Sequence, residues 1–465
     1  MKSNKQWIHE TIDRVSEFFE TLPERPVRSS VSFDEVRRHL HQELPDVGLE
    51  PKQVIDTLVQ GADPGLVASA GPRYFGFVIG GSLPAALAAD WLTSAWDQNA
   101  ALATASPAAA AVEDIVAGWV LALLGLPATS TVGFVTGGQM ANFVGLAAGR
   151  DAVLARADWD IAERGLTDAP PIEIFVSAEA HATIFSALRL LGLGSKHVHQ
   201  VATDEHGRMR IDELRRALST VNGPALVCAQ AGNVNTGAFD PISDIASAAH
   251  ERGAWLHVDG AFGLWAAACP SRSTLSQGVE DADSLATDAH KWLNVPYDSG
   301  IAIVRDGDAH RAAMRKSGAY LVRGADNVRN GHDFTPESSR RARGFALYAA
   351  LLSLGRQGLA DLIENHCVLA TRMADLLRSA PHVRILNDVV LNQVLVRFEP
   401  PGVDADAFTR TVIDRVQSDG TCWVGPTRWH DMDAMRFSVS NWSTTRDDID
   451  RAAEAILNAA RQRTM

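Results

Sequence analysis

The sequence is poor in cysteine and in positive charge, and each shortage excludes a class of protein. Only four of its 465 residues are cysteine and none forms a C-x-x-C pair, so we expect neither a metal site nor a disulfide framework. So few thiols fit a reducing cytoplasm. The 43 basic residues are outnumbered by 56 acidic ones, for a formal charge of −13. Nucleic acids and anionic membranes require a dense basic face, so we expect neither as a partner.

Long uninterrupted hydrophobic runs are also missing. The 35 residues between Asp114 and Arg150 carry no charge, but a membrane helix needs about 20 consecutive apolar residues. Leu126-Pro127 and the polar run at residues 129–131 interrupt this stretch. It therefore predicts a buried helix that leads into a glycine-rich turn. The N-terminal residues are charged and lack the apolar core of a secretory signal.

The middle of the chain alternates between short β-branched runs and helical patterns. Such alternation is typical of βαβ units, so we predict an α/β fold with a mostly parallel sheet between helices. We further predict an N-terminal arm at residues 1–75, a large domain at 76–349 and a small α+β domain at 350–465. The expected strands are Ile172–Ser177, Ala225–Ala229, Trp255–Val258, Gly300–Val304, Leu391–Phe398 and Met435–Val439, and the expected helices are Asp212–Thr220, Pro241–Arg252, Leu359–Leu377 and Arg446–Arg461.

The N-terminal arm has the pattern of an amphipathic helix. Apolar residues recur at helical spacing from Gln6 to about Leu22, and Pro23 ends the pattern. The apolar stripe of this helix must be covered. Two interpretations are open: the stripe docks on its own domain, or it packs across a dimer interface.

Three segments carry residues suited to catalysis. Asp259 follows the apolar strand in A-W-L-H-V-D-G-A-F-G, and Gly260 lets the chain turn away, which places the carboxylate at the edge where open α/β sheets bind ligands. Lys291 lies in A-T-D-A-H-K-W-L-N, a polar and aromatic setting in which a partly desolvated amine suits Schiff-base formation. His181 follows another short strand at the start of a helix.

Taken in order, these segments carry a family resemblance. His181, then H-V-D-G-A-F, then D-A-H-K-W resembles the pyridoxal-phosphate-dependent group II amino acid decarboxylases, which include glutamate and aromatic-L-amino-acid decarboxylases. The resemblance implies fold-type I, a pyridoxal 5'-phosphate cofactor, a homodimer, and decarboxylation of an L-amino acid to the amine and CO₂. It extends over nearly the whole chain, through E-R-P-V, Gly71–Ser94, A-G-N-V-N-T-G-A-F-D-P-I at Ala231–Ile242 and M-R-F-S-V-S-N at Met435–Asn441.

The resemblance also implies roles for single residues around the cofactor. Lys291 would form the Schiff base, Asp259 would pair with the ring nitrogen, and His181 would stack on the ring and contact the substrate. V-T-G-G-Q-M-A-N at Val135–Asn142 is a strand end, two glycines and a helix start, so its backbone N–H groups suit a phosphate. Ala141 replaces the Ser that relatives usually have there. The other expected cofactor contacts are Thr136, Gly138, Gln139, Asn233, Ala261 and His290.

Substrate contacts are implied in the same way. Arg436, in M-R-F-S-V-S-N, is expected to bind the substrate α-carboxylate with two parallel donors, and Arg428 is a lower-ranked alternative. Tyr74, Phe77 and Gln98 lie in segments that line the substrate pocket in relatives. They leave aromatic, acidic and small amino acids open as substrates.

The chain departs from the family in one loop. Decarboxylases of this group commonly carry a Tyr after the Schiff-base lysine, which protonates the substrate carbon once CO₂ has left, but Gly324–Arg340 contains no Tyr. The best placement puts Asn330 or His332 there, and an imidazole is a competent proton donor near neutral pH. Without a donor, reaction with oxygen would yield an aldehyde. The alternatives to amine formation are therefore oxidative deamination coupled to decarboxylation, a carbon–carbon lyase reaction, or a cofactor-binding protein without catalysis.

Overall fold

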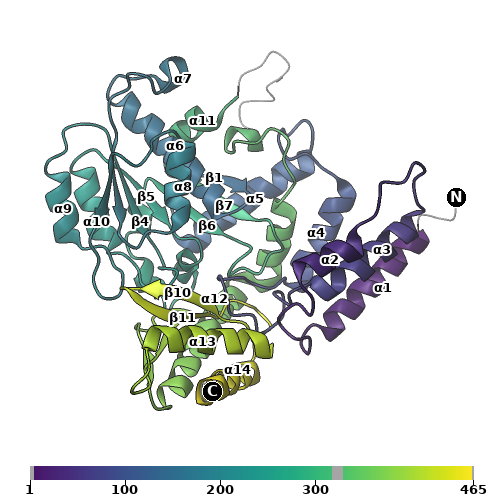
Figure 1. The fold of residues 1–465 in the computed structure, drawn as a ribbon. Helices are drawn as coiled ribbons and strands as arrows, with labels where there is room; N and C mark the ends of the chain where they lie inside the picture. Colours follow the sequence, from purple (N-terminus) through teal and green to yellow (C-terminus); the bar gives the residue numbers. More distant parts are fainter. Residues whose placement is uncertain (1–4, 317–327, 463–465) are drawn as a thin grey trace. The chain divides into compact units, whose positions relative to one another are not determined.

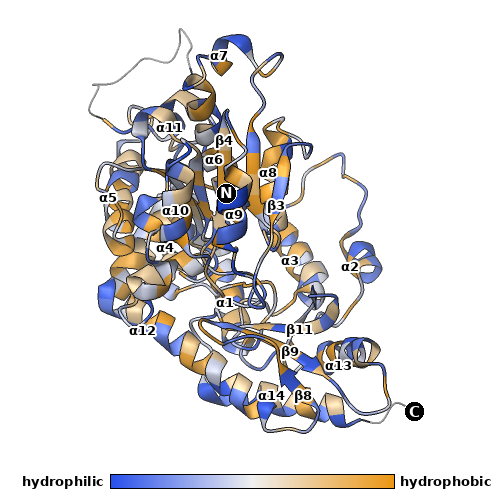
Figure 2. Cartoon of the chain, turned by 90° about the vertical axis from the view of Figure 1, so that its left-hand side faces the viewer, coloured by the Kyte–Doolittle hydropathy of each residue, from blue (hydrophilic) through white to orange (hydrophobic). Residues whose placement is uncertain are grey.

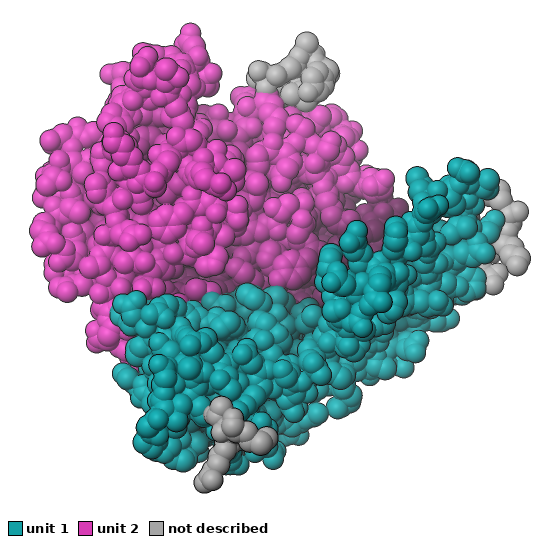
Figure 3. All heavy atoms as spheres, in the orientation of Figure 1, with its two compact units in different colours: residues 1–79, 372–386, 395–465 teal, residues 80–371, 387–394 magenta. Residues whose placement is uncertain are grey.

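The computed structural model of the chain describes residues 5–316 and 328–462. Two compact units emerge from its contacts, coloured separately in Figure 3. The smaller unit holds residues 1–79, 372–386 and 395–465, and the larger unit holds residues 80–371 and 387–394. The predicted domains are continuous segments that meet at residues 75 and 349, whereas each unit combines separate segments of the chain. The division into three domains therefore stays a prediction.

The larger unit is built on a seven-stranded sheet with the order β1-β7-β6-β5-β4-β2-β3. The four pairs from β6 to β3 are parallel, and β7 is antiparallel to both β1 and β6, so the predicted mostly parallel sheet is confirmed. Its strands are β1 (Thr131–Val135), β2 (Glu173–Ser177), β3 (Val198–Val201), β4 (Ala225–Gln230), β5 (Trp255–Asp259), β6 (Ser284–Asp288) and β7 (Gly300–Val304).

Helices cover this sheet because its strands are hydrophobic along their whole length. Every residue of β4, β5, β6 and β7 is buried. Helix α6 packs against β5, β6 and β7, and α10 packs against β4 and β5 (Figure 1). The helices are α4 (Pro84–Trp96), α5 (Pro107–Leu124), α6 (Gly138–Ala155), α7 (Ile161–Arg164), α8 (Ala182–Leu190), α9 (Ile211–Leu218), α10 (Ile242–His250), α11 (Gly307–Met314) and most of α12 (Gly344–Arg378), with 3-10 turns η2 (Gly263–Ala268), η3 (Ser273–Ser276), η4 (Val279–Asp281) and η5 (Gly331–Asp333).

The charge-free stretch forms the second part of α5, β1 and most of α6. Helix α5 ends at Leu124 because Gly125 adopts a φ of 67°, a left-handed conformation that suits glycine. One side of α5 is buried, and hydrophobic colour dominates the helix in Figure 2. No helix among the described residues is long and apolar enough to cross a membrane.

The smaller unit contains the N-terminal helices and a four-stranded sheet with the order β10-β11-β9-β8. The pairs β10–β11 and β8–β9 are antiparallel. Its elements are α1 (Lys5–Thr21), α2 (Phe33–Leu40), α3 (Pro51–Ala62), η1 (Asp63–Gly65), the end of α12, β8 (Val383–Ile385), β9 (Gln393–Phe398, whose first two residues belong to the larger unit), α13 (Ala405–Asp419), β10 (Gly425–Trp429), β11 (Met432–Ser438) and α14 (Arg446–Arg461).

Helix α12 differs most from its predicted length. The periodicity predicts a helix over Leu359–Leu377, whereas α12 runs from Gly344 to Arg378. Gly355 inside it has a non-helical φ of 61°, so two helical segments meet at this glycine. The residues before Gly355 are hydrophobic on several sides because they are buried, and they lack the one-sided pattern that reveals a surface helix.

Candidate active site

Two carboxylates and a lysine lie at one edge of the seven-stranded sheet. Asp259 ends β5 and Asp288 ends β6, and the two strands are parallel with Asp259 opposite Ala286. Lys291 follows three residues after Asp288. Because parallel strands end at the same edge, the sheet brings these groups to the place where open α/β sheets bind ligands.

Asp259 is almost fully buried, with 6% of its surface exposed. One carboxylate oxygen accepts the N–H of Ala261 at 3.1 Å, and the other accepts Asn142 Nδ2 at 3.1 Å. Two fixed donors orient the carboxylate and stabilise its negative charge. The site therefore provides an anchored anion where the sequence predicts the partner of the ring nitrogen.

Asn142 connects this carboxylate to a buried histidine. Its Oδ1 lies 2.9 Å from His257 Nε2, and His257 Nδ1 lies 2.8 Å from Ser284 Oγ. Burial lowers the pKa of His257 to about 3, so the ring is neutral near pH 7 and carries one N–H. The amide of Asn142 thus bridges β5 and the first turns of α6.

Lys291 is paired with a carboxylate that the sequence analysis does not identify. Its Nζ lies 2.7 Å from Asp288 Oδ2. The neighbouring Trp292 is fully buried and donates its indole N–H to His366 Nδ1 at 2.7 Å. A Cβ on Gly80 would lie 1.9 Å from the carbonyl oxygen of Lys291. The main chain at Lys291 is therefore fixed from two sides.

The predicted phosphate turn lies beside these residues. Gly138 begins α6 and donates its N–H to Asp288 Oδ1. A Cβ on Gly300 would lie 2.4 Å from Gly137 Cα, so this close packing requires glycine. His290 Nδ1 accepts the N–H of Ser299 at 3.1 Å, and burial lowers the pKa of His290. The structure thus brings Gly138 and His290 together around Asp288.

The other predicted cofactor residues lie near strand ends but differ in exposure. Thr136 is half-buried and Gln139 is exposed, on the two sides of the glycine pair. Asn233 is buried and its Oδ1 accepts the N–H groups of Asn235 and Thr236, so this side chain stabilises its own turn.

His181 forms the N-cap of α8. Its Nδ1 lies 2.8 Å from Thr183 Oγ1, and that hydroxyl accepts Asn142 Nδ2 at 3.3 Å. The ring itself is exposed. A chain of hydrogen bonds therefore joins His181 through Thr183 and Asn142 to Asp259, the other predicted residue of this chain.

His332, the predicted proton donor, lies in η5 and is buried. Its main-chain N–H donates to the Ala101 carbonyl at 3.1 Å, and its Nε2 lies 3.5 Å from Asp333 Oδ1. Burial lowers its pKa. Within the described residues no hydrogen bond or ion pair joins His332 to Lys291 or Asp288. Residues 324–327 of the loop in question lie outside the described residues. Asn330, the alternative, accepts the N–H of Ala103 at 3.1 Å.

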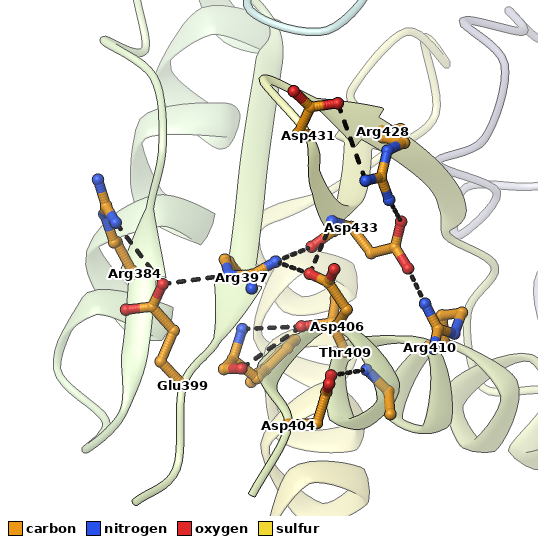
Figure 4. Close-up of polar contacts among 12 residues, drawn as sticks. Arg384, Arg397, Glu399, Asp404, Asp406, Thr409, Arg410, Arg428, Asp431 and Asp433 are labelled. Carbon is orange, nitrogen blue, oxygen red and sulfur yellow. Dashed lines mark hydrogen bonds and ion pairs between the residues drawn. The ribbon is translucent and has the colours of Figure 1, made fainter.

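Arg436 and Arg428, the two predicted carboxylate clamps, differ in what already binds them. Arg436 lies in β11, and among the residues that the structure describes its buried Nε has no hydrogen-bond partner. Burial lowers its pKa. Arg428 is exposed and pairs with Asp433 at 3.1 Å, within the network of charges in Figure 4. Of these two arginines, only Arg436 has a buried donor left for a ligand in the described part of the chain.

The predicted substrate residues Tyr74 and Phe77 stack on one ring. Their centroids lie 5.0 and 5.2 Å from that of Trp423. A Cβ on Gly76 would lie 2.0 Å from Trp423, so this glycine allows the stack to form. Phe77 remains 58% exposed. Gln98 lies in the larger unit, is exposed, and donates to the Trp96 carbonyl at 2.8 Å.

These residues fit pyridoxal phosphate. A lysine next to an anchored carboxylate and a glycine turn at a helix N-terminus are the donors and acceptors that this cofactor requires. The sequence analysis misses Asp288, Asn142 and Trp292. Asp288 follows an apolar strand as Asp259 does, so the same signal identifies it; the contacts of Asn142 and Trp292 join distant segments and leave no local pattern.

Comparisons with known proteins agree with this chemistry. The model of the pyridoxal-dependent decarboxylase conserved domain matches residues 34–399. Two similar proteins are the aromatic-L-amino-acid decarboxylase of Bacillus atrophaeus, 25% identical over 96% of this chain and 93% of that protein, and the phenylacetaldehyde synthase of Arabidopsis thaliana, 26% identical over 91% and 89%.

Solved structures share the fold. That of Oryza sativa TDC with PLP and tryptamine superposes with a TM-score of 0.92 and 24% identity, over 98% of this chain and 97% of that one. The predicted fold type and the predicted pyridoxal 5'-phosphate cofactor are confirmed by these matches. The chain belongs to the pyridoxal-dependent decarboxylase family, and the predicted enzyme class, a pyridoxal-phosphate-dependent carboxy-lyase, is confirmed by that membership.

Proposed function

We propose that this enzyme decarboxylates an aromatic L-amino acid to the corresponding amine and CO₂. The observation that carries the proposal is the meeting of Lys291, Asp259 and the glycine turn of α6 at one sheet edge. Relatives named for aromatic, tyrosine and tryptophan decarboxylation support the substrate class.

Each residue of the site has a separate role in the proposed reaction. When bound, pyridoxal phosphate draws electrons from the bond that breaks at the substrate's Cα. Lys291 would hold the cofactor aldehyde through its amine, and Asp259 would hold a proton at the ring nitrogen. The donors from Asn142 and Ala261 orient the Asp259 carboxylate.

Arg436 supplies the binding of the substrate's α-carboxylate in this proposal. Its guanidinium carries a buried Nε without a hydrogen-bond partner in the described part of the chain. A buried donor left without an acceptor costs about 1–3 kcal/mol, and a bound carboxylate removes that cost. Fixing the carboxylate also fixes which bond at Cα breaks.

The aromatic substrate class is supported by the smaller unit. Tyr74, Trp423 and Phe77 form a stack whose outer ring, Phe77, is exposed. Aromatic rings contribute about 0.5–1.5 kcal/mol per pair beyond the area they bury. Burial raises the pKa of Tyr74 to about 12, so its phenol stays neutral and offers a donor without charge.

Aldehyde formation is the second candidate, and two observations keep it open. The loop at residues 324–340 contains no Tyr, and relatives include proteins named 4-hydroxyphenylacetaldehyde synthase and phenylacetaldehyde synthase. His332 is the proposed donor that directs the reaction to the amine. Its pKa is lowered by burial, so the protonated ring is a stronger acid, but less of it is present near pH 7.

A product assay tests both candidates. The purified enzyme with pyridoxal phosphate is incubated with each of the twenty amino acids, and amine, CO₂, aldehyde, ammonia and peroxide are measured with and without oxygen. We expect oxygen-independent amine and CO₂ from an aromatic amino acid. Equal yields of aldehyde, ammonia and peroxide that vanish without oxygen would establish the second candidate. No product and no absorbance change on adding cofactor would refute the proposal.

We also propose that the enzyme is a cytoplasmic homodimer. Helix α1 exposes apolar side chains along one face, and α3 adds two more. An exposed apolar surface of this kind is typical of an interface between subunits. The residues that form it are Trp7, Ile8, Ile12, Phe19, Val54 and Leu58.

A further inference from the structure

A buried carboxylate lies where the phosphate of the cofactor is expected. Asp288 is 1% exposed. One oxygen accepts the N–H of Gly138, at the N-terminus of the 18-residue helix α6, and the other lies 2.7 Å from Lys291 Nζ. The positive end of the helix dipole and the positive lysine therefore already share an anion that belongs to the chain.

The space around this carboxylate is filled. A Cβ on Gly138 would lie 2.8 Å from Asp288 Oδ2, and one on Gly137 would lie 3.0 Å from His290 Cε1. Not even a methyl group fits between the turn and the carboxylate. A phosphate that reaches the N–H of Gly138 must therefore displace Asp288.

The local charges do not favour a second anion. Lys291 is the cation on Asp288, and burial lowers the pKa of His290, whose Nε2 lies 3.4 Å away, so that ring is neutral near pH 7. From the other elements at this edge, α6 contributes backbone N–H groups and β5 contributes the acidic Asp259, while Asp298 in the loop before β7 is already paired with Arg343 at 2.7 Å. A phosphate dianion brought to Asp288 meets a like charge, and like charges at close range destabilise each other.

We propose that Asp288 is an internal competitor of the cofactor's phosphate. In the cofactor-free chain it occupies the N–H of Gly138 and holds Lys291 in an ion pair, and it thereby weakens the binding of ligands that carry phosphate. The proposal rests on the proposed function, because it takes pyridoxal phosphate as the cofactor.

The ion pair must also open before the cofactor is attached. An ammonium has no lone pair with which to attack an aldehyde. On loading, Lys291 releases a proton to solvent, its nitrogen bonds to the aldehyde carbon, and the aldehyde oxygen leaves as water. Asp288 opposes this exchange at two places, because it holds Lys291 Nζ in an ion pair and occupies the N–H of Gly138 at the phosphate end.

Ligand binding to the full chain, freed of cofactor, tests the proposal. The unaltered protein and Asp288→Asn are titrated with inorganic phosphate, pyridoxal phosphate and pyridoxal, with calorimetry or fluorescence as the readout. We expect Asp288→Asn to bind inorganic phosphate at least about tenfold more tightly, and to favour pyridoxal phosphate over pyridoxal by about the same added factor. Asp281→Asn, at the exposed end of η4, carries the same change in net charge and should leave all three affinities unchanged.

Unchanged or weaker phosphate binding by Asp288→Asn would overturn the proposal. If that variant does not fold, the affinities of the unaltered protein test the proposal. Because Asp288 opposes the phosphate, we expect the affinity for pyridoxal phosphate to exceed that for pyridoxal by less than about a hundredfold. A larger ratio would contradict competition. Failure of the proposed function looks different, because the unaltered protein then gains no absorbance band with pyridoxal phosphate at all.

Discussion

At the residue scale, the two aspartates of the site are held by different neighbours. Asp259 is held by an amide and a backbone N–H, whereas Asp288 is held by a lysine and a helix N-terminus. The two aspartates, at the ends of adjacent strands, therefore differ in which groups they bind. Asp259 is already oriented for a ligand, while the contacts of Asp288 must be exchanged.

Lys291 is the residue on which the proposed chemistry depends most. We expect Lys291→Ala to lose the covalent cofactor and its absorbance band, and to lower kcat by at least about a thousandfold, since nucleophilic attachment and proton transfer both use this amine. Absorbance spectra and turnover with an aromatic amino acid check this. Lys196→Ala, an exposed lysine, is the control and should keep both; a Lys291→Ala protein with normal turnover would contradict the assignment.

Asn142 is expected to matter for stability because it satisfies two buried partners. Asn142→Ala removes one buried hydrogen bond from Asp259 and one from His257, so we expect the free energy of unfolding to fall by about 2–4 kcal/mol. Chemical denaturation measures the change. Asn222→Ala, at an exposed position, should stay within about 0.5 kcal/mol, and an equally small effect at Asn142 would argue against the network.

At the element scale, four strands of the seven-stranded sheet were predictable because they are largely buried and read as short continuous apolar runs. The predicted strands Ile172–Ser177, Ala225–Ala229, Trp255–Val258 and Gly300–Val304 correspond to β2, β4, β5 and β7 within a residue at each end. Strand β10 was not predicted, because its burial alternates irregularly and it carries Pro426 and Arg428.

The glycine turn before α6 makes an element-scale prediction. In Gly300→Ala the new Cβ would meet the backbone of Gly137 at 2.4 Å, so we expect lower stability and at least about tenfold weaker binding of pyridoxal phosphate. Gly118→Ala is the matched control: nothing lies within 4 Å of its Cβ inside α5, and alanine there should stabilise the protein by about 0.5–1 kcal/mol. Thermal unfolding and cofactor titration compare the two; a Gly300→Ala protein with unchanged affinity would contradict the close approach.

At the scale of the whole molecule, buried titratable groups set the pH dependence of stability. Burial lowers the pKa of His257 and of His310 from 6.5 to about 3, and raises that of Asp240 from 3.8 to about 7. Between about pH 4 and 6.5 the unfolded chain therefore binds two protons at the histidines and releases one at the aspartate. The net proton uptake makes stability fall as the pH falls.

We expect these three groups to lower the free energy of unfolding by about 1.4 kcal/mol per pH unit between pH 6.5 and 4. Denaturant titrations at several pH values give the slope. His310→Gln removes one linked proton, so its slope should be smaller by the same amount. An identical slope in His310→Gln would show that His310 titrates normally.

The apolar face of α1 makes a prediction about assembly. Ile12→Glu places a charge among exposed apolar side chains, and burying an unpaired charge in an interface costs several kcal/mol. We expect this variant to sediment as a monomer at concentrations where the unaltered chain is a dimer. Glu17→Lys, an exposed site on the same helix, should leave the dimer intact; an unaltered chain that sediments as a monomer would refute the homodimer.

The sequence by itself determined the fold class, the family and the residues Lys291 and Asp259, because an apolar strand followed by a polar group and a turn is a local pattern. Only the tertiary structure decided how those groups are held. Gly138 and Asp288 are 150 residues apart, and Asn142 and Asp259 are 117 apart. It also separated Arg436, with its unpartnered buried Nε, from Arg428, which Asp433 neutralises. Hydrogen bonds and ion pairs between distant segments depend on which strand ends meet at one edge, and no local pattern contains that information.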